Sequence, residues 1–369
     1  MSNPPIRIAF FLPALHGGGA ERVMLNLAGA FAEDQNLTID LVLAQAEGVL
    51  LSDISPRVRL VNLNASRLIT CLPQLINYLH REKPKAMLSA MCHANVIAVL
   101  AKKIAGSQTR LVISEHGMIS KRAKHSSRYR ERLLPYLMRC FYPLADKVVA
   151  VSKGVADDLI KTLGLSSHSV RVIYNPVISE RLFASSLEKV SHRWLGPERP
   201  AIILAVGRLV PEKDFVTLIQ AFALLRKWQQ AKLIILGEGP ERQKLSALIQ
   251  TMNLDDEVDL PGFVANPYPY MRQTNLLVLS SLFEGLGNVL IEALAVGTPV
   301  VATDCPGGPA EILENGRWGK LVPLGDTNAL AQAMAETLNN EAVSDKTQRL
   351  KDFNIKTVTE YYKEALLPS

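Results

Sequence analysis

Glu284 and Glu292 stand eight residues apart in the stretch EGLGNVLIEALAVG, directly after a run of strand-forming residues. The spacing predicts that the first acid lies in a loop at a strand end and the second about one turn inside the following helix. A carboxylate in such a loop can accept hydrogen bonds from sugar hydroxyls, and one inside the helix can reach the ribose of a nucleotide. The amides of Gly287, Asn288 and Val289 would then face phosphate oxygens. Taken singly, either acid could instead be there because the helix dipole stabilises it.

Two cations follow an earlier apolar run, in the stretch GRLVPEKD. Arg208 and Lys213 are expected at the carboxyl end of a strand, which is where doubly wound sheets bind ligands. Two fixed cations there could stabilise a leaving diphosphate. By themselves they could equally be an exposed pair with little energetic role. The acids, the glycines and the cationic loop together favour a ligand site.

A glycine-rich stretch, HGGGAERV (16–23), follows the first apolar run and opens a helix. It predicts either a phosphate contact at the helix start or simply a tight turn. Arg22 stands where the third glycine of a dinucleotide fingerprint would be, and no GK[ST] follows. These departures count against an oxidoreductase and an NTPase.

Composition places the chain among globular proteins of two domains. It has 369 residues, 48% of them hydrophobic and 21% charged, and a net charge of +6 that suits anionic ligands or surfaces. The four cysteines are widely spaced without a CxxC pair, which favours a reducing compartment over a disulfide framework or a zinc site. The run IAFFLPAL is expected to be a buried strand and not a signal peptide. No apolar stretch reaches the ~18–20 residues needed to span a bilayer.

Short apolar runs alternate with helical patterns along the whole chain, which predicts parallel sheets covered on both faces. The expected strands are 6–12, 38–44, 110–115 and 147–152, then 201–209, 231–239, 276–281 and 299–304. Helices are expected at 20–32 and 356–367, and 171–183 is expected to be a connector without clear periodicity. The fold class is therefore α/β, with two doubly wound Rossmann-like domains facing across a cleft. The expected domains are 1–175, which would bind the acceptor, 176–355, which would bind the donor, and a C-terminal helix in 356–369 that could return to the first domain.

In this order the motifs are similar to one known family. They are GGGAERVMLNLA, SEHG, VVAVSKGV, NPV, GRLVPEKD, LGEGP, DLPGFVANPYPYM, EGLGNVLIEALAVGTPVVATDCPGGPAEIL and GKLVPLGD. Together they resemble the retaining glycosyltransferases of family 4, in the GT-B superfamily, whose hallmark is Glu-x7-Glu. The resemblance extends to bacterial enzymes of envelope polysaccharide and lipid-linked oligosaccharide synthesis.

The resemblance implies a nucleotide-sugar donor site, mainly in the second half. Arg208 and Lys213 would hold the diphosphate, while Glu284 would contact the transferred sugar and Glu292 the ribose. The remaining donor-site residues would be Gly207, Gly287, Asn288 and Val289, with Phe263 and Val264 of LPGFV against the base, and Gly18 and Gly19 of the first half near the diphosphate.

His116, in VISEHGMIS, is expected at a strand end in the first half. Without the resemblance it would be a capping or core histidine. With it, His116 would contact the donor sugar, without serving as a general base, because the retaining reaction is described as a front-face displacement assisted by the leaving phosphate. The family implies no metal and no cofactor, and the sequence has no Asp-x-Asp triplet after a strand.

The segment KRAKHSSRYRERLLPYLMR (121–139) is strongly basic. From its second half onward, apolar residues at 133, 134, 137, 140 and 141 recur at helical spacing. The segment could be a solvated face backing a core helix, or a patch for anionic lipid headgroups or a lipid-diphosphate acceptor. Nucleic acid is not favoured as a partner, because aromatic residues do not alternate with the basic ones. The predicted surface residues are Lys121, Arg122, Lys124, Arg128, Arg130 and Arg132.

Together with the basic segment, the resemblance implies a hexosyl-type glycosyltransferase, using a UDP-sugar and a saccharide acceptor on a polyprenyl diphosphate or lipopolysaccharide. It would be cytoplasmic and peripheral on the inner face of the cytoplasmic membrane. Alternatives are a nucleotide-sugar epimerase, a phosphorylase carrying lysine-bound pyridoxal phosphate, or a non-catalytic nucleotide-sugar-binding module recruited to membranes.

Overall fold

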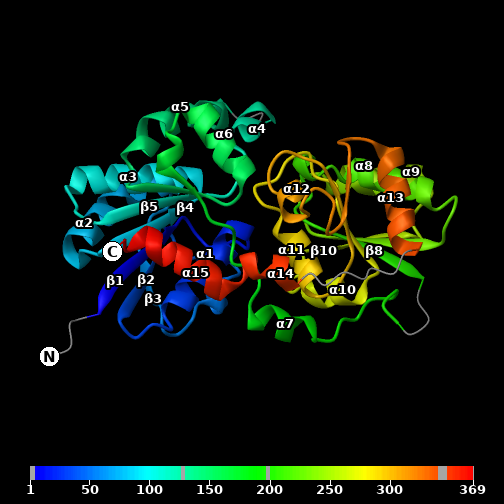
Figure 1. Cartoon of the computed structure of the whole chain (residues 1–369), viewed down its shortest axis with the longest axis horizontal. Coiled ribbons are helices and arrows are strands. Elements are labelled where there is room, and N and C mark those ends of the chain that lie inside the picture. The colour runs from blue at the N-terminus through cyan, green and yellow to red at the C-terminus, as the bar shows by residue number, and fades with distance from the viewer. Residues whose placement is uncertain (1–4, 126–128, 197–199, 340–346, 369) are drawn as a thin grey trace. The chain divides into compact units, whose positions relative to one another are not determined.

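The structure is a computed structural model that describes residues 5–125, 129–196, 200–339 and 347–368 (Figure 1). The chain forms two compact units. Unit 1 comprises Met1–Pro176 and Asp352–Ser369, and unit 2 comprises Val177–Lys351. The end of the chain therefore completes the unit that its beginning starts.

Unit 1 is built on a parallel sheet of seven strands in the order β3-β2-β1-β4-β5-β6-β7. The strands are β1 (Ile6–Leu12), β2 (Leu37–Leu43), β3 (Arg59–Asn62), β4 (Ala86–Ala90), β5 (Arg110–Glu115), β6 (Lys147–Ala150) and β7 (Val170–Val172). Its helices are α1 (Gly19–Phe31), α2 (Leu72–Glu82), α3 (Cys92–Ala105), α4 (Ile119–His125), α5 (Tyr129–Phe141), α6 (Lys153–Leu163) and α15 (Ile355–Leu366).

Unit 2 has a parallel sheet of six strands in the order β10-β9-β8-β11-β12-β13. The strands are β8 (Ala201–Val206), β9 (Ala231–Leu236), β10 (Val258–Gly262), β11 (Leu276–Leu279), β12 (Val300–Thr303) and β13 (Lys320–Val322). Its helices are α7 (Glu180–Ser186), α8 (Phe215–Leu225), α9 (Arg242–Thr251), α10 (Tyr268–Gln273), α11 (Asn288–Ala295), α12 (Pro309–Ile312), α13 (Thr327–Asn339) and α14 (Thr347–Leu350).

Burial on both faces explains why the inner strands are almost wholly apolar. In β1, the five residues from Ile8 to Leu12 are completely inaccessible to solvent. The C-terminal helix α15 packs beside α1 over the strands of unit 1 (Figure 1). Its Tyr362 joins the same core cluster as Phe10 and Phe31, so the last helix covers apolar surface that the sheet would otherwise expose.

Each sheet has a switch point, where the strand order reverses direction. It lies between β1 and β4 in unit 1 and between β8 and β11 in unit 2. Ligands of doubly wound sheets bind beyond the carboxyl ends of the strands at such a point. The loops that follow these strands are therefore the places to look for a site.

The expected strands and the two expected helices are confirmed to within a few residues at their ends. The segment 171–183, expected to connect the domains, contains the boundary between the two units, but it also contributes to β7 and begins α7. Strands β3, β4, β7, β10 and β13 were not among the predicted ones. Several are short or lie at sheet edges, where an apolar run is weak; β10 even contains Pro261, which an edge strand tolerates. Among the described residues, no helix is both long and apolar enough to cross a membrane.

Candidate active site

The structure brings Lys213 and Glu284 together at the switch point of unit 2. Lys213 ends a 3-10 helix in the loop after β8, and its Nζ donates to Glu284 Oε1 at 2.5 Å. Ser281, just after β11, donates its hydroxyl to the same oxygen at 2.6 Å. Both charged side chains are mostly buried, with 22% of Lys213 and 12% of Glu284 exposed. An ion pair is thus fixed at the carboxyl ends of β8 and β11, where a ligand is expected.

The loops that hold this pair rest on glycines of neighbouring loops. A Cβ atom on Gly307 would lie 2.0 Å from the carbonyl oxygen of Glu284, and one on Gly237 would lie 1.9 Å from that of Gly207. Gly308 and Gly239 pack as closely on the backbone of Leu286 and Leu209. Only glycine permits such a close approach of two backbones. These residues therefore determine how closely the neighbouring loops pack on one another. This packing role of the glycines in CPGG and LGEGP was not predicted from the sequence. The role of Ser281 was not predicted either.

Helix α11 begins at Asn288, as predicted, after Gly287 in a left-handed conformation with φ of +96°. Glu292 is half-buried in the second turn of this helix. Asn288 and Val289 form its first turn. The two glutamates therefore occupy the loop and helix positions that their spacing indicated.

The other predicted residues of unit 2 are more exposed. Arg208 follows β8 and is exposed, while Gly207 beside it is half-buried. Phe263, which is 54% exposed, and Val264 follow the edge strand β10, so two strands separate them from β11. Arg242 of α9 donates two hydrogen bonds to the Leu260 carbonyl, at 2.8 and 3.2 Å, and thereby fixes the end of β10.

In unit 1, the glycine-rich loop is capped by its own helix. The Glu21 carboxylate accepts hydrogen bonds from the amides of Gly17 and Gly18, at 2.7 and 3.0 Å, and its side chain is buried. Gly19 begins α1. The bonds account for the loop as a turn closed by the glutamate half of a capping box, because Gly18 has no side chain to supply the other half. Its signal, a glutamate three residues after the N-cap, was available in the sequence. The predicted contact of Gly18 and Gly19 with a diphosphate stays a prediction.

His116 follows β5, as expected, and lies beside a buried acid. Its Nε2 is 2.9 Å from the Ser114 hydroxyl, while its Nδ1 is buried without a partner among the described residues. Burial lowers the pKa of His116 to about 4, so the ring is neutral at neutral pH. Burial also raises the pKa of Glu115 to about 7, although Tyr142 donates a hydrogen bond to its Oε2 at 2.7 Å. Sequence analysis overlooked this acid inside SEHG.

Both side chains line a cavity of about 160 Å³ in unit 1, between the ends of β4 and β5 and the helices α4 and α5. The cavity is largely apolar, with Met91, Met118 and Leu134 in its wall. It offers space for a small, mostly uncharged group beside a neutral imidazole and a carboxyl that titrates near neutrality.

The basic segment is largely exposed, and one of its arginines is paired. Arg122 pairs with Glu131, its Nε lying 2.9 Å from Oε2, so it connects α4 to α5 and lines the cavity. Lys124 and Arg132 are exposed and Lys121 is half-buried. Arg128 lies outside the described residues, and so does the side chain of Arg130.

The apolar residues of α5 divide between the core and solvent. Leu134 and Met138 face the core, whereas Leu133, Tyr136 and Leu137 are 41%, 71% and 50% exposed. The helix thus presents one narrow stripe to the core and a second apolar stripe to solvent. The sequence pattern does not distinguish them, because both recur at helical spacing.

Two family models match consecutive parts of the chain. The model described as Glycosyltransferase Family 4 matches residues 17–181, and the one described as Glycosyl transferases group 1 matches residues 188–357. The fold is of the GT-B class, and the two family models are models of glycosyltransferase domains. The chain belongs to glycosyltransferase family 4.

Similar proteins include two from Campylobacter jejuni. The N-acetylgalactosamine-N,N'-diacetylbacillosaminyl-diphospho-undecaprenol 4-alpha-N-acetylgalactosaminyltransferase is 34% identical over 247 residues, which are 67% of this chain and 65% of that protein. The GalNAc-alpha-(1->4)-GalNAc-alpha-(1->3)-diNAcBac-PP-undecaprenol alpha-1,4-N-acetyl-D-galactosaminyltransferase is 27% identical over 374 residues and covers 96% of each chain. Among solved structures, Anabaena Alr3699/HepE in complex with UDP and glucose has a TM-score of 0.78 at 22% identity, covering 98% of this chain and 99% of that one.

We expect Gly307→Ala to destabilise the protein more than Gly297→Ala. Both glycines have positive φ, which costs an alanine about 1–2 kcal/mol, but a Cβ at Gly297 meets nothing within 4 Å. At Gly307 the clash with the Glu284 carbonyl should add about 1–3 kcal/mol. Urea unfolding of both variants measures the difference, and equal losses would contradict the close packing.

We also expect Glu115→Gln to change how stability depends on pH. The pKa of Glu115 is about 7 in the folded protein and near its ordinary value of 4.5 in the unfolded chain, so the wild type loses stability as pH rises between these values. The variant lacks this loss. Over that interval, its free energy of unfolding should therefore rise relative to that of the wild type, by on the order of 3 kcal/mol. The opposite contribution of His116, whose folded pKa is lowered, is present in both proteins and cancels. Urea unfolding from pH 4.5 to 7.5 tests this, and parallel curves would refute it.

Proposed function

We propose that this protein transfers a sugar from a UDP-sugar, with retention of configuration, to a saccharide acceptor linked to a lipid diphosphate or lipopolysaccharide. The observation that carries the proposal is the Lys213–Glu284 pair at the switch point of unit 2. A leaving nucleoside diphosphate gains negative charge in the transition state, and a cation already fixed beside it stabilises that charge without reorganisation. Arg208, in the same loop, would add a second positive charge.

The hydrogen bonds of Glu284 indicate how it would hold the sugar. Lys213 and Ser281 both donate to Oε1. No described residue donates to Oε2, which leaves this oxygen for hydroxyls of the transferred sugar. Glu284 is thus oriented by the protein on one side and open to ligand on the other.

The remaining donor contacts follow from the segments around this pair. Glu292, in the second turn of α11, would bind the ribose hydroxyls, and the amides at the start of α11 would face phosphate oxygens. The backbone at Phe263 and Val264 would contact the base. Uridine is favoured because Anabaena Alr3699/HepE, which has the same fold, was solved in complex with UDP.

In the proposed reaction, the acceptor hydroxyl oxygen bonds to the anomeric carbon on the face from which UDP departs. The bond from that carbon to the phosphate oxygen breaks, and its electron pair goes to the phosphate. The hydroxyl proton passes to the same phosphate. The protein supplies positive charge and orientation through Lys213, Arg208 and Glu284, so the step needs neither metal nor protein base.

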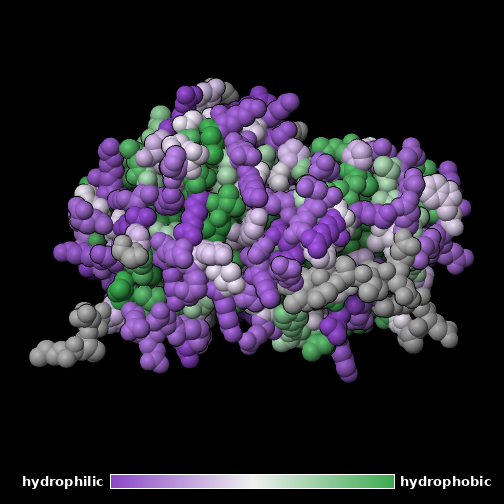
Figure 2. All heavy atoms as spheres, in the orientation of Figure 1, coloured by the Kyte–Doolittle hydropathy of each residue, from purple (hydrophilic) through white to green (hydrophobic). Residues whose placement is uncertain are grey.

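The acceptor is inferred from the names of the relatives and from the surface of unit 1. Both Campylobacter jejuni relatives are named for substrates on diphospho-undecaprenol. Exposed Leu133, Tyr136 and Leu137 on α5, flanked by exposed Arg132, could enter the headgroup region of an anionic membrane. Figure 2 shows hydrophobic side chains among hydrophilic ones over the region of α5 and α6. We therefore propose peripheral attachment to the inner face of the cytoplasmic membrane.

We expect UDP, rather than GDP or ADP, to raise the unfolding temperature of the wild type. At ~100 times its dissociation constant, UDP adds about 2.7 kcal/mol to the folded state. Lys213→Ala should lose this stabilisation and lower turnover about 10²-fold or more, because it removes the fixed cation. Lys227→Ala, which changes an exposed lysine of the same unit, should retain both. Normal UDP stabilisation and turnover in Lys213→Ala would overturn the donor site.

We expect the double variant Tyr136→Ser and Leu137→Ser to sediment about tenfold less with vesicles of phosphatidylglycerol and phosphatidylethanolamine. Removing two apolar side chains from the interface deletes burial that contributes roughly 1.5–3 kcal/mol for each side chain fully buried. Leu187→Ser is the control, because Leu187 is 68% exposed and lies in unit 2. Sedimentation equal to that of the wild type would refute the membrane surface on α5.

A further inference from the structure

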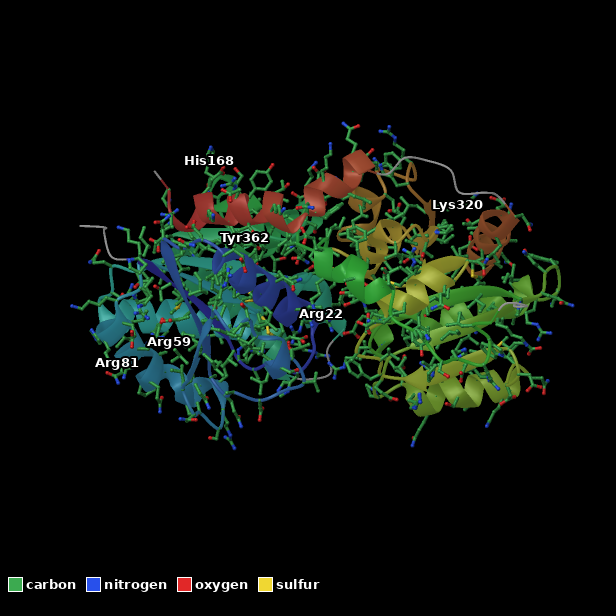
Figure 3. All side chains as sticks on the ribbon, turned by 90° about the horizontal axis from the view of Figure 1, so that it is seen from below. Arg22, Arg59, Arg81, His168, Lys320 and Tyr362 are labelled. Atoms are coloured by element: carbon green, nitrogen blue, oxygen red, sulfur yellow. The ribbon has the colours of Figure 1, made fainter. Side chains whose placement is uncertain are left out.

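A chain of three polar side chains connects the C-terminal helix to His116. Tyr362 lies on the side of α15 that faces the strands of unit 1 (Figure 3), and it is completely buried. Its Oη is 3.3 Å from the Ser114 hydroxyl on β5. That hydroxyl is in turn 2.9 Å from His116 Nε2. The chain joins residues 248 apart in sequence within one unit.

When the Ser114 hydroxyl donates to one of its two neighbours, the hydrogens can be ordered along this chain in two directions. If Tyr362 donates to Ser114, then Ser114 donates to Nε2, and the hydrogen of the neutral ring is on Nδ1. In the opposite direction Nε2 carries the hydrogen, and Ser114 donates to Tyr362. The hydroxyl hydrogen of Tyr362 would then have no acceptor among the described residues, since Ser114 is its hydrogen-bond partner there.

The first direction leaves fewer buried groups without partners. It satisfies both hydroxyl hydrogens and leaves only Nδ1–H, whereas the second leaves the Tyr362 hydrogen and the Nδ1 lone pair. Each direction leaves one buried donor without an acceptor, so the second is worse by the unpaired Nδ1 lone pair, and an unpaired buried polar atom costs about 1–3 kcal/mol. A phenol is also the more acidic hydroxyl and hence the better donor.

We propose that Tyr362 is a positioning residue that, through Ser114, keeps the hydrogen of His116 on Nδ1. His116 then presents an N–H group, with Nε2 occupied by Ser114, and it binds a substrate oxygen as a hydrogen-bond donor. This role in the reaction rests on the proposed function. The lowered pKa of His116 agrees with a ring that is neutral at working pH. The ring lines the cavity beside Glu115, where a sugar hydroxyl or amide oxygen could accept the hydrogen.

The tautomer can be measured directly by ¹⁵N NMR of the full chain labelled at histidine. The resonances of His116 are identified by their loss in His116→Ala. In the wild type, Nδ1 should have the shift of a protonated ring nitrogen and Nε2 that of an unprotonated one. In Tyr362→Phe, which keeps the ring in the core, Ser114 is freed to accept from Nε2, so the Nε2–H form should become populated.

Two further variants separate the chain of hydrogen bonds from packing. Ser114→Ala should also abolish the preference for Nδ1–H. Tyr361→Phe changes a neighbouring tyrosine that is 44% exposed, and it should leave the spectrum as in the wild type. An Nε2–H ring in the wild type, or a spectrum unchanged in Tyr362→Phe, would overturn the inference whatever the activity.

Kinetics tests the consequence for the reaction. Tyr362→Phe should lower kcat about tenfold with little change in the KM for UDP-sugar, and it should have little further effect in a His116→Ala background. A shifted tautomer with normal kcat would overturn the role of Tyr362 in catalysis. A protein with the expected tautomer but no transferase activity with any UDP-sugar would overturn the proposed function and leave the assignment of the hydrogen intact.

Discussion

Contact between the backbones of adjacent strand-end loops is the constraint on which the site of unit 2 depends. Strands of a parallel sheet lie side by side, so the loops at their carboxyl ends crowd together unless side chains are absent. Gly237 and Gly307 remove those side chains where they would meet the carbonyls of Gly207 and Glu284. The loops after β8 and β11 can therefore pack closely against the neighbouring loops. In this arrangement Lys213 reaches the carboxylate of Glu284.

Much of this fold follows from patterns that are strong in a single sequence. The long apolar strands at 6–12, 110–115 and 201–206 are buried on both faces, and they alternate with helices whose starts carry glycine or polar caps. The loop position of Glu284 and the helical position of Glu292 were predictable for the same reason: a strand, a glycine-rich turn and a helix follow each other without ambiguity. Weak strands at the sheet edges, such as β7, were not predictable.

The parts of the site that could not be predicted depend on contacts between distant segments. Ser281 becomes relevant only because the sheet brings it to Glu284, and Tyr362 only because α15 returns to unit 1. The apolar residues of α5 show the same limit. Helical spacing tells which side chains share a face, but it does not tell which of two apolar faces the core covers, and Leu133 and Leu137 proved to be exposed.

The two units share a topology but manage charge in different ways, and this difference fits a division of labour. In unit 2 the acid Glu284 is paired with Lys213, and both stay partly open to solvent, which suits a substrate with charged phosphates. In unit 1 burial raises the pKa of Glu115 and lowers that of His116, so both groups are driven toward their neutral forms. Neutral groups with fixed hydrogens recognise hydroxyl and amide groups, which carry no charge but form hydrogen bonds in defined directions. The proposed transferase would bind a diphosphate that gains charge and sugars that remain neutral. One fold can serve both needs, because the ends of its strands can carry either charged or neutral side chains.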